Sequence, residues 1–91
     1  MARPTQQITQ LSQYSQGVKD LRAAHSMSQQ QFSNMLGMAI NTIARYETGR
    51  APDAASMVQL ARAARSKGHE RLARLFLDGA ALYIGAKEVT I

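Results

Sequence analysis

The chain has no cysteine and no tryptophan, and its acidic residues are few. Without cysteine it can form neither disulfides nor thiolate metal sites, which is typical of proteins from a reducing compartment such as a cytosol. No segment approaches the roughly 20 consecutive apolar residues of a membrane span. The start, MARPTQQITQ, also lacks the apolar core of a signal peptide. We therefore expect a cytoplasmic protein that does not act at a membrane.

Residue patterns that indicate catalysis or metal binding are missing as well. His25 and His69 are isolated, and neither has a second histidine or an acidic cluster at ligand spacing. The carboxylates of Glu70, Asp78 and Glu88 do not form a persuasive acid/base pair. There is no glycine-rich phosphate loop and no nucleophile elbow. These absences predict a protein that is not an enzyme and that binds no metal and no cofactor.

Positive charge is what the chain has in excess. Eleven Lys and Arg oppose six Asp and Glu, which gives a formal net charge of +5 and a pI near 10.3. Most of these basic residues are arginine, whose planar guanidinium matches phosphate oxygens and guanine edges with two hydrogen bonds. This balance predicts a polyanionic partner, most often nucleic acid. A basic protein without such a partner is the alternative that charge alone leaves open.

The length and the spacing of apolar residues predict one all-α domain. The 91 residues suffice for one compact domain and not for two. Apolar residues recur at helical spacing in five segments. The predicted helices cover about 11–24, 28–36, 40–48, 53–67 and 69–85.

The two ends of the chain are less regular. The first ten residues are polar and contain Arg3-Pro4, so residues 1–10 are expected to form a flexible N-terminal arm, with the domain covering 11–91. Gly17 weakens the first helix, so its start near Ser15 is an alternative. The tail KEVTI is compatible with a short C-terminal strand or a frayed end.

The second and third helices are separated by a very short turn. Ser28 and Gln31 have the spacing of a capping box at the start of the second helix. Gly37 suits the left-handed position that ends a helix, and Ser33 is small enough to lie where the two helices cross. The buried face of the second helix is expected to hold Phe32, Met35 and Leu36. A turn this short predicts a helix-turn-helix.

The segment VKDLRAAHSMSQQQFSNMLGMAINTIARYETGR, residues 18–50, resembles the helix-turn-helix domain of the Cro/phage-repressor (XRE-like) family. The resemblance extends to about Leu77. The positions that match the family pattern are Lys19, Leu21, Arg22, Ser28, Gln29, Gly37, Met38, Ile43, Glu47 and Gly49. Three positions depart from it, because Ser33 replaces an alanine, Ala39 a capping serine or threonine, and Tyr46 a tryptophan. The resemblance implies a five-helix, repressor-type DNA-binding domain.

In this family the third helix lies in the major groove. With Ile43 and Tyr46 inward, about 100 degrees per residue turns Asn41 and Arg45 outward and leaves Ile40 on the flank. Asn41 can pair bidentately with adenine, and Arg45 can bind guanine or a phosphate. Ile40 can contact a thymine methyl group. The spacing leaves two alternatives open. Asn41 and Arg45 could be an ordinary solvated face, and Ile40 could pack against Met38 or the second helix.

Other positions are expected to flank or support this surface. Gln29 opens the second helix, where a helix N-terminus can bind phosphate, although it could also be only the first residue after a cap. Thr42 and Arg50 are further phosphate candidates. The resemblance also pairs Arg22 of the first helix with Glu47 at the end of the third. Such a pair is a structural salt bridge that orients the recognition helix.

The last helix carries two apolar stripes. One stripe holds Leu72, Leu75, Phe76, Ala80 and Tyr83, and the other holds Ala73, Leu77, Ala81 and Ile84. One stripe suffices to dock the helix on a core, so the second implies another partner surface. We expect Leu77, Ala81 and Ile84 to form the interface of a homodimer. Helical spacing does not rank the two stripes, and a tail that folds back over the spare stripe is the alternative.

Taken together, these features predict a sequence-specific regulator that binds double-stranded DNA at the nucleoid of a bacterial or phage-infected cell. We expect a homodimeric repressor on a palindromic operator, able to control its own gene, of the kind found in phages, mobile elements and antitoxins. The alternative is a protein-interaction module, such as an antitoxin that binds a partner protein through helix 69–85 and for which DNA binding is secondary.

Overall fold

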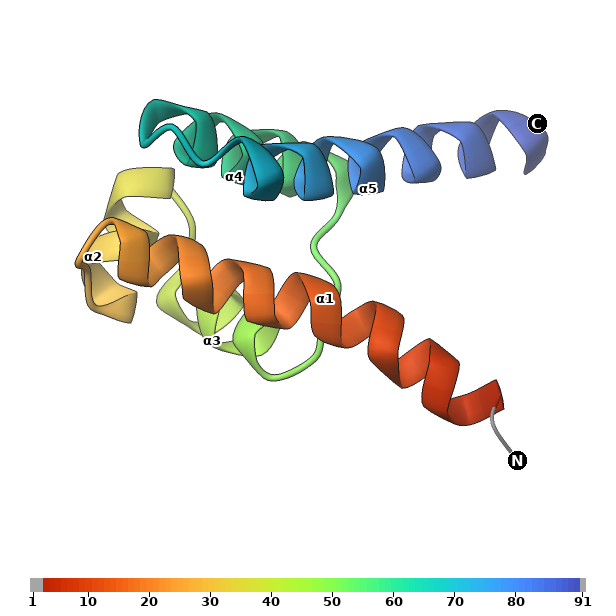
Figure 1. The fold of residues 1–91 in the computed structure, drawn as a ribbon, viewed down its shortest axis with the longest axis horizontal. Helices are drawn as coiled ribbons and strands as arrows, with labels where there is room; N and C mark the ends of the chain where they lie inside the picture. Colours follow the sequence, from red (N-terminus) through yellow and green to blue (C-terminus); the bar gives the residue numbers. More distant parts are fainter. Residues whose placement is uncertain (1–2, 91) are drawn as a thin grey trace. The chain divides into compact units, whose positions relative to one another are not determined.

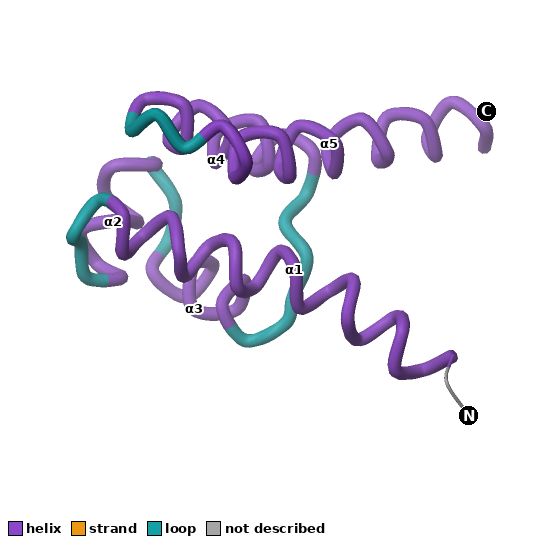
Figure 2. The backbone as a smooth tube through the Cα atoms, viewed as in Figure 1, coloured by secondary structure: helices purple, strands orange, loops and turns teal. Residues whose placement is uncertain are grey.

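The computed structural model describes the backbone of residues 3–90 and the side chains of residues 13–82. Its five helices are α1 (Arg3–Ala24), α2 (Gln29–Leu36), α3 (Ile40–Glu47), α4 (Ala54–Ser66) and α5 (Glu70–Thr90) (Figure 1). No strand occurs in residues 3–90 (Figure 2). The predicted all-α, five-helix fold is therefore confirmed. The chain divides into two compact units, Met1–Ala51 with α1 to α3 and Pro52–Ile91 with α4 and α5.

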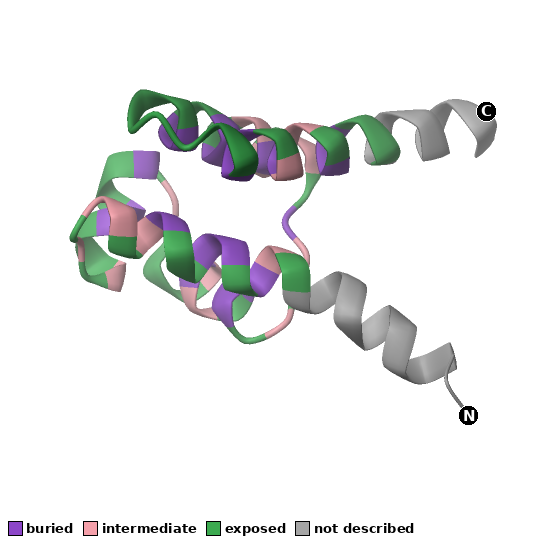
Figure 3. Ribbon diagram, in the orientation of Figure 1, coloured by how far each residue is buried: buried purple, intermediate pink, exposed green. Residues whose placement is uncertain are grey.

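The first unit is built around α3, which contacts both α1 and α2. Val18 and Leu21 of α1, Phe32 of α2 and Ile43 of α3 are fully buried, and Tyr46 is nearly so. The buried residues form one face of each helix (Figure 3). This arrangement follows from the helical spacing of the apolar residues, because positions three or four apart share a face.

Helix α1 begins at Arg3, which corrects the expected start at Leu11 or near Ser15. Pro4 lies in the first turn, where a missing N–H is no loss. Glutamine, which is frequent in this segment, is a good helix former despite its polarity. The polar composition of residues 3–10 is therefore compatible with a helical backbone. The flexibility of the expected N-terminal arm stays a prediction.

The second unit is a hairpin of α4 and α5. Asp53 caps α4, because its carboxylate accepts a hydrogen bond of 2.8 Å from the backbone N–H of Ser56. Gly68 adopts a positive φ of 75° after α4, a left-handed conformation that favours glycine. The buried apolar residues of this hairpin are Met57, Leu60, Ala61, Ala63, Ala64, Leu72, Ala73, Phe76 and Ala80.

The buried face of α5 contains residues from both predicted stripes. Ala73, from the stripe expected to face a partner, is fully buried, whereas Leu75, from the other, is half-buried. Leu77 is half-buried and Ala81 is exposed. The side chains of Tyr83 and Ile84 lie outside the described residues. The inward face is therefore centred between the two stripes, which the sequence could not rank.

The end of α5 also differs from the prediction. The helix continues to Thr90, so the backbone of residues 87–90 is helical and not a strand. Alanine, lysine and glutamate in this segment favour a helix, and the glycine at position 85 lowers this preference without ending it. None of the described helices is both long enough and apolar enough to cross a membrane.

Candidate nucleic-acid interface

The turn between α2 and α3 is shaped by caps that the sequence predicted. The Ser28 hydroxyl accepts a hydrogen bond of 3.1 Å from the Gln31 N–H, and the Gln31 side chain accepts one of 2.9 Å from the Ser28 N–H. This reciprocal capping box starts α2. Gly37 ends the helix with φ of 70°, a left-handed conformation in which a side chain is strained. The Met38 N–H then donates to the Ser33 carbonyl over 2.9 Å, which closes the turn.

The contact between α2 and α3 depends on small and apolar residues. Ser33 is fully buried, and its hydroxyl donates a hydrogen bond of 2.8 Å to the Gln30 carbonyl, so its polar atom is satisfied inside its own helix. Leu36 is buried as predicted. Met35 is not, because its side chain is 42% exposed, which corrects the predicted buried face of α2. Phe32 and Leu36, which are four residues apart, define that face without it.

Helix α3 has one buried side and one exposed side. Ile43 and Tyr46 point inward, with 0% and 5% of their surface exposed. Asn41 and Arg45 are exposed, and Ile40 is 38% exposed. An asparagine, an arginine and an isoleucine therefore share the outer surface of a short helix whose opposite side is fixed in the core.

The end of α3 is held by a hydrogen-bond network that joins three helices. Arg22 of α1 donates to both carboxylate oxygens of Glu47, with Nε to Oε2 at 2.7 Å and Nη2 to Oε1 at 3.1 Å. Gln29, the first residue of α2, donates from Nε2 to Glu47 Oε1 over 3.0 Å. The third guanidinium nitrogen of Arg22 donates to the Met27 carbonyl over 3.1 Å. The side chain of Glu47 is 5% exposed and that of Arg22 is 27% exposed, so the carboxylate is the buried partner.

The network also sets the protonation of its members. Burial raises the pKa of Glu47, but the hydrogen bonds from Arg22 and Gln29, with the charges of Arg22 and Lys19, lower the pKa more, so it falls below its ordinary value of 4.5. The hydrogen bond to Glu47 raises the pKa of Arg22 against the opposing effect of burial. Both side chains are therefore charged at neutral pH, and their bidentate geometry fixes the orientation of α3 relative to α1.

Comparison with known proteins agrees with this geometry. A family model described as helix-turn-helix matches residues 18–67, from α1 to the end of α4. The chain belongs to the XRE/Cro-type helix-turn-helix family. Searches of the curated proteins and of the solved structures found no significant match. As a member of this family, it is a DNA-binding transcription regulator.

The expected flanking residues of the helix-turn-helix lie in different environments. Arg50 is exposed just after α3, and its backbone N–H donates to the Arg45 carbonyl over 3.0 Å, which holds the loop against the helix end. Thr42 is half-buried. Gln29 is half-buried too, and one amide N–H is already bonded to Glu47. Their contacts with phosphate stay predictions.

Sequence reasoning missed the bond between Gln29 and Glu47. A signal for it existed, because a carboxylate has about four acceptor sites and a single guanidinium fills only two of them. A buried glutamate in the helix-turn-helix domain therefore needs a further donor. The donor could not be chosen without knowing that the start of α2 and the end of α3 meet.

Proposed function

We propose that this regulator represses transcription by binding a palindromic operator as a homodimer, with α3 in the major groove. The observation that carries the proposal is the placement of Asn41 and Arg45 on the exposed side of α3 while Ile43 and Tyr46 anchor the other side. A helix presented in this way can bring side chains to base edges without leaving its own core uncovered.

Each exposed side chain fits one kind of base contact. Asn41 has a donor and an acceptor in one plane, which suits the N6 and N7 atoms of adenine. Two of the three guanidinium nitrogens of Arg45 suit the O6 and N7 atoms of guanine. Ile40 offers an apolar surface for a thymine methyl group, and its 38% exposure keeps it accessible for such a contact.

The ends of α2 and α3 favour phosphate contacts beside these bases. Ala39, the N-cap of α3, makes no side-chain hydrogen bond, so no side chain at this position satisfies the first N–H groups of the helix. Such N–H groups attract anions. We assign three side chains to the DNA phosphates beside these bases. They are Thr42 in the first turn of α3, Gln29 in the first turn of α2 and Arg50 beyond the end of α3.

A dimer follows from the small number of bases that one helix reads. One recognition helix contacts too few base pairs to select one site among the competing sites of a genome. Two copies on half-sites about one helical turn apart double the number of bases read. Occupying such a site at a promoter excludes the polymerase, which is the simplest route to repression and allows control of the regulator's own gene.

Selection of operators from random duplex DNA tests the proposal directly. We expect the enriched sequences to form two inverted half-sites about one helical turn apart. The same selection with Asn41→Ala and Arg45→Ala provides the control, since each variant should lose preference at its own base pair only. Enrichment of single, unpaired half-sites would contradict the dimer, and enrichment of no sequence at all would contradict base reading.

A further inference from the structure

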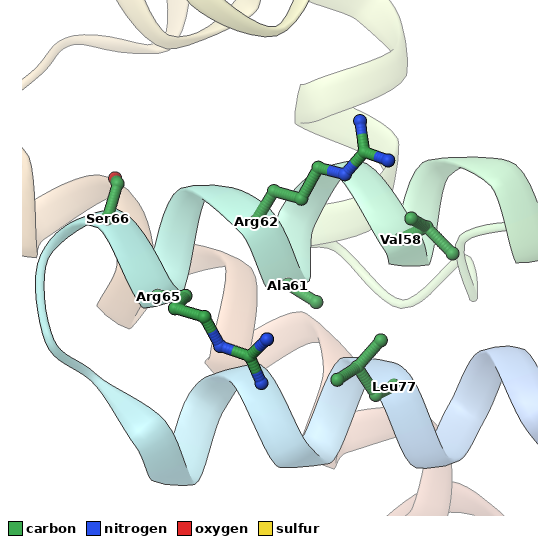
Figure 4. Close-up of a pocket in the computed structure, with 6 residues that line it drawn as sticks. All are labelled: Val58, Ala61, Arg62, Arg65, Ser66 and Leu77. Carbon is green, nitrogen blue, oxygen red and sulfur yellow. The ribbon is translucent and has the colours of Figure 1, made fainter.

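A groove with a volume of about 390 Å³ lies between α4 and α5, within the second unit (Figure 4). Its lining residues are Val58, Ala61, Arg62, Arg65, Ser66 and Leu77. In Figure 4, Leu77 of α5 faces Ala61 of α4, and the guanidinium of Arg65 reaches from α4 toward α5. The groove therefore has an apolar floor and a cation at its rim.

The floor can hold an apolar side chain. Val58 and Leu77 are each half-buried, so part of each side chain is in contact with solvent. Ala61 between them is buried and small, which leaves room above it. A volume of about 390 Å³ lies at the lower end of the range of natural ligand pockets. It fits one or two side chains of a peptide.

The charges at the rim are available to a partner. Arg65 has a side chain that is 63% exposed, and its ion pair with Glu70 is long, at 3.8 Å, and solvated. Such a pair stabilises the fold very little. Arg62 forms no ion pair with any side chain among residues 13–82. In Figure 4 the Arg62 guanidinium points away from α5, so Arg65 is the cation beside the apolar floor. An exposed guanidinium at this place favours a ligand with a carboxylate next to an apolar residue.

We propose that the α4–α5 groove binds an acidic amphipathic segment of another protein. A carboxylate of the segment would pair with Arg65, and its apolar side chain would cover Ala61 and Leu77. Charge complementarity at the rim selects this occupant over a second copy, because the chain carries a net charge of +5 and an acidic segment matches the rim better than another basic chain. The apolar floor selects it over DNA backbone, because charged phosphates lose free energy when they are placed against an apolar surface.

The proposal does not depend on the operator or on dimerisation, but it has a consequence for both. Leu77 lines the groove and is also expected in the homodimer interface. If the proposed dimer exists, the acidic segment and the second copy compete for this side chain. Binding of the segment would then lower operator affinity by displacing the second copy.

Random short peptides displayed on phage and selected against the full chain provide the test. We expect enriched peptides to combine Asp or Glu with a neighbouring Leu, Ile or Phe. The strongest of them, made synthetically, should bind Arg65→Glu on the order of tenfold more weakly than the unmodified chain. A version with lysine in place of its acidic residues should regain affinity for Arg65→Glu, which a folding defect cannot produce. Leu77→Ala should weaken both peptides.

Arg71→Glu is the matched control, because Arg71 is also exposed in the same hairpin, lies outside the groove and changes the net charge equally. Equal losses in both charge variants would contradict a specific groove, and so would the absence of enriched peptides. A changed sedimentation rate of Arg65→Glu without peptide would assign the groove to a second copy. A larger loss of affinity for random duplex DNA in Arg65→Glu than in Arg71→Glu would assign it to phosphate. Either result would overturn the proposal.

Discussion

Gln29 Nε2 donates to Glu47 Oε1 over 3.0 Å, which joins the first residue of α2 to the last residue of α3. The same carboxylate is held by Arg22 through two further hydrogen bonds. The side chain that we assign to a phosphate is thus also part of the support of the recognition helix. Its remaining amide N–H and its carbonyl oxygen are not used by this bond.

Replacement of Gln29 by alanine should therefore lower two quantities at once. We expect the free energy of unfolding to fall by about 1 kcal/mol, since one hydrogen bond to a buried carboxylate is lost. We also expect weaker binding to all DNA sequences alike. Gln30→Ala is the control, because Gln30 is exposed on the same helix and bonds only within α2. Thermal unfolding and binding to random duplex DNA give the two values. An unchanged stability of Gln29→Ala would show that Gln29 does not help to hold the recognition helix.

The Arg22–Glu47 pair should make stability depend on pH at the acidic end. The pKa of Glu47 is lowered in the folded state, so its contribution is fully present above the ordinary value of 4.5 and is lost as the pH falls through the lower folded value. Denaturant unfolding should show constant stability from neutral pH to about pH 5 and a decline below it.

Glu47→Gln should remove the part of the acidic decline in stability that Glu47 causes. It should also lower the free energy of unfolding by about 2 kcal/mol at neutral pH, because Arg22 loses its charged partner. We expect less than the full cost of a buried unpaired charge, since the side chain of Arg22 is 27% exposed. The same substitution at Glu70 is the control, because its side chain is 71% exposed. Similar changes in both variants would show that the network at Glu47 has no special role.

Base reading and phosphate contact should differ in how they depend on sequence and salt. Asn41→Ala and Arg45→Ala should each cost about 1–3 kcal/mol at the operator and relax preference at one base pair. Arg50→Ala should weaken binding to every sequence and reduce the slope of log affinity against log salt by about 1. Titrations against a library of operator variants at two salt concentrations separate these cases. Position-independent losses in all three variants would contradict the assignment.

Ser26 has a positive φ of 55° at the corner between α1 and α2, which is unusual for a residue other than glycine. Ser26→Gly should raise the free energy of unfolding by about 0.5–1 kcal/mol, because the left-handed strain exceeds the extra backbone entropy of glycine. Ser26→Val should lower it by about 1–2 kcal/mol. A substitution series followed by thermal unfolding measures both. Equal stability of the three proteins would mean that this corner tolerates any residue.

The parts of the fold that local chemistry determines could be predicted from the sequence. The capping box of Ser28 and Gln31, the left-handed Gly37 and the helical spacing of Ile43 and Tyr46 are all properties of a few neighbouring residues. The fold of the first unit follows from them, and the family pattern adds the Arg22–Glu47 pair.

The errors lie where tertiary contacts decide. Met35 has helical spacing suited to a core, yet it is exposed because Phe32 and Leu36 already fill the buried face of α2. The inward face of α5 contains Ala73 in place of Leu75, a shift that the spacing of two equally apolar stripes could not reveal. The bond from Gln29 to Glu47 joins residues from different helices, so no local pattern contains it.

The last prediction concerns the homodimer. Leu77 is half-buried and Ala81 is exposed, so each has surface left for a second copy. Together with Ile84 they form one helical stripe, and a contiguous apolar stripe of this kind suits an interface. Leu77→Asp combined with Ile84→Asp should give a folded monomer that loses operator binding and keeps weak, salt-sensitive affinity for any duplex, since a charge placed in an apolar interface has no partner there.

Asp78→Asn is the control for this variant, because Asp78 is exposed beside Leu77 and its change removes a charge without adding one to the apolar stripe. It should remain dimeric and bind its operator. Sedimentation with and without operator DNA distinguishes the cases, and circular dichroism shows whether the double variant folds. If the chain sediments as a monomer at tens of micromolar, both free and on its operator, the dimer is excluded. Leu77 would then have a role only in the α4–α5 groove.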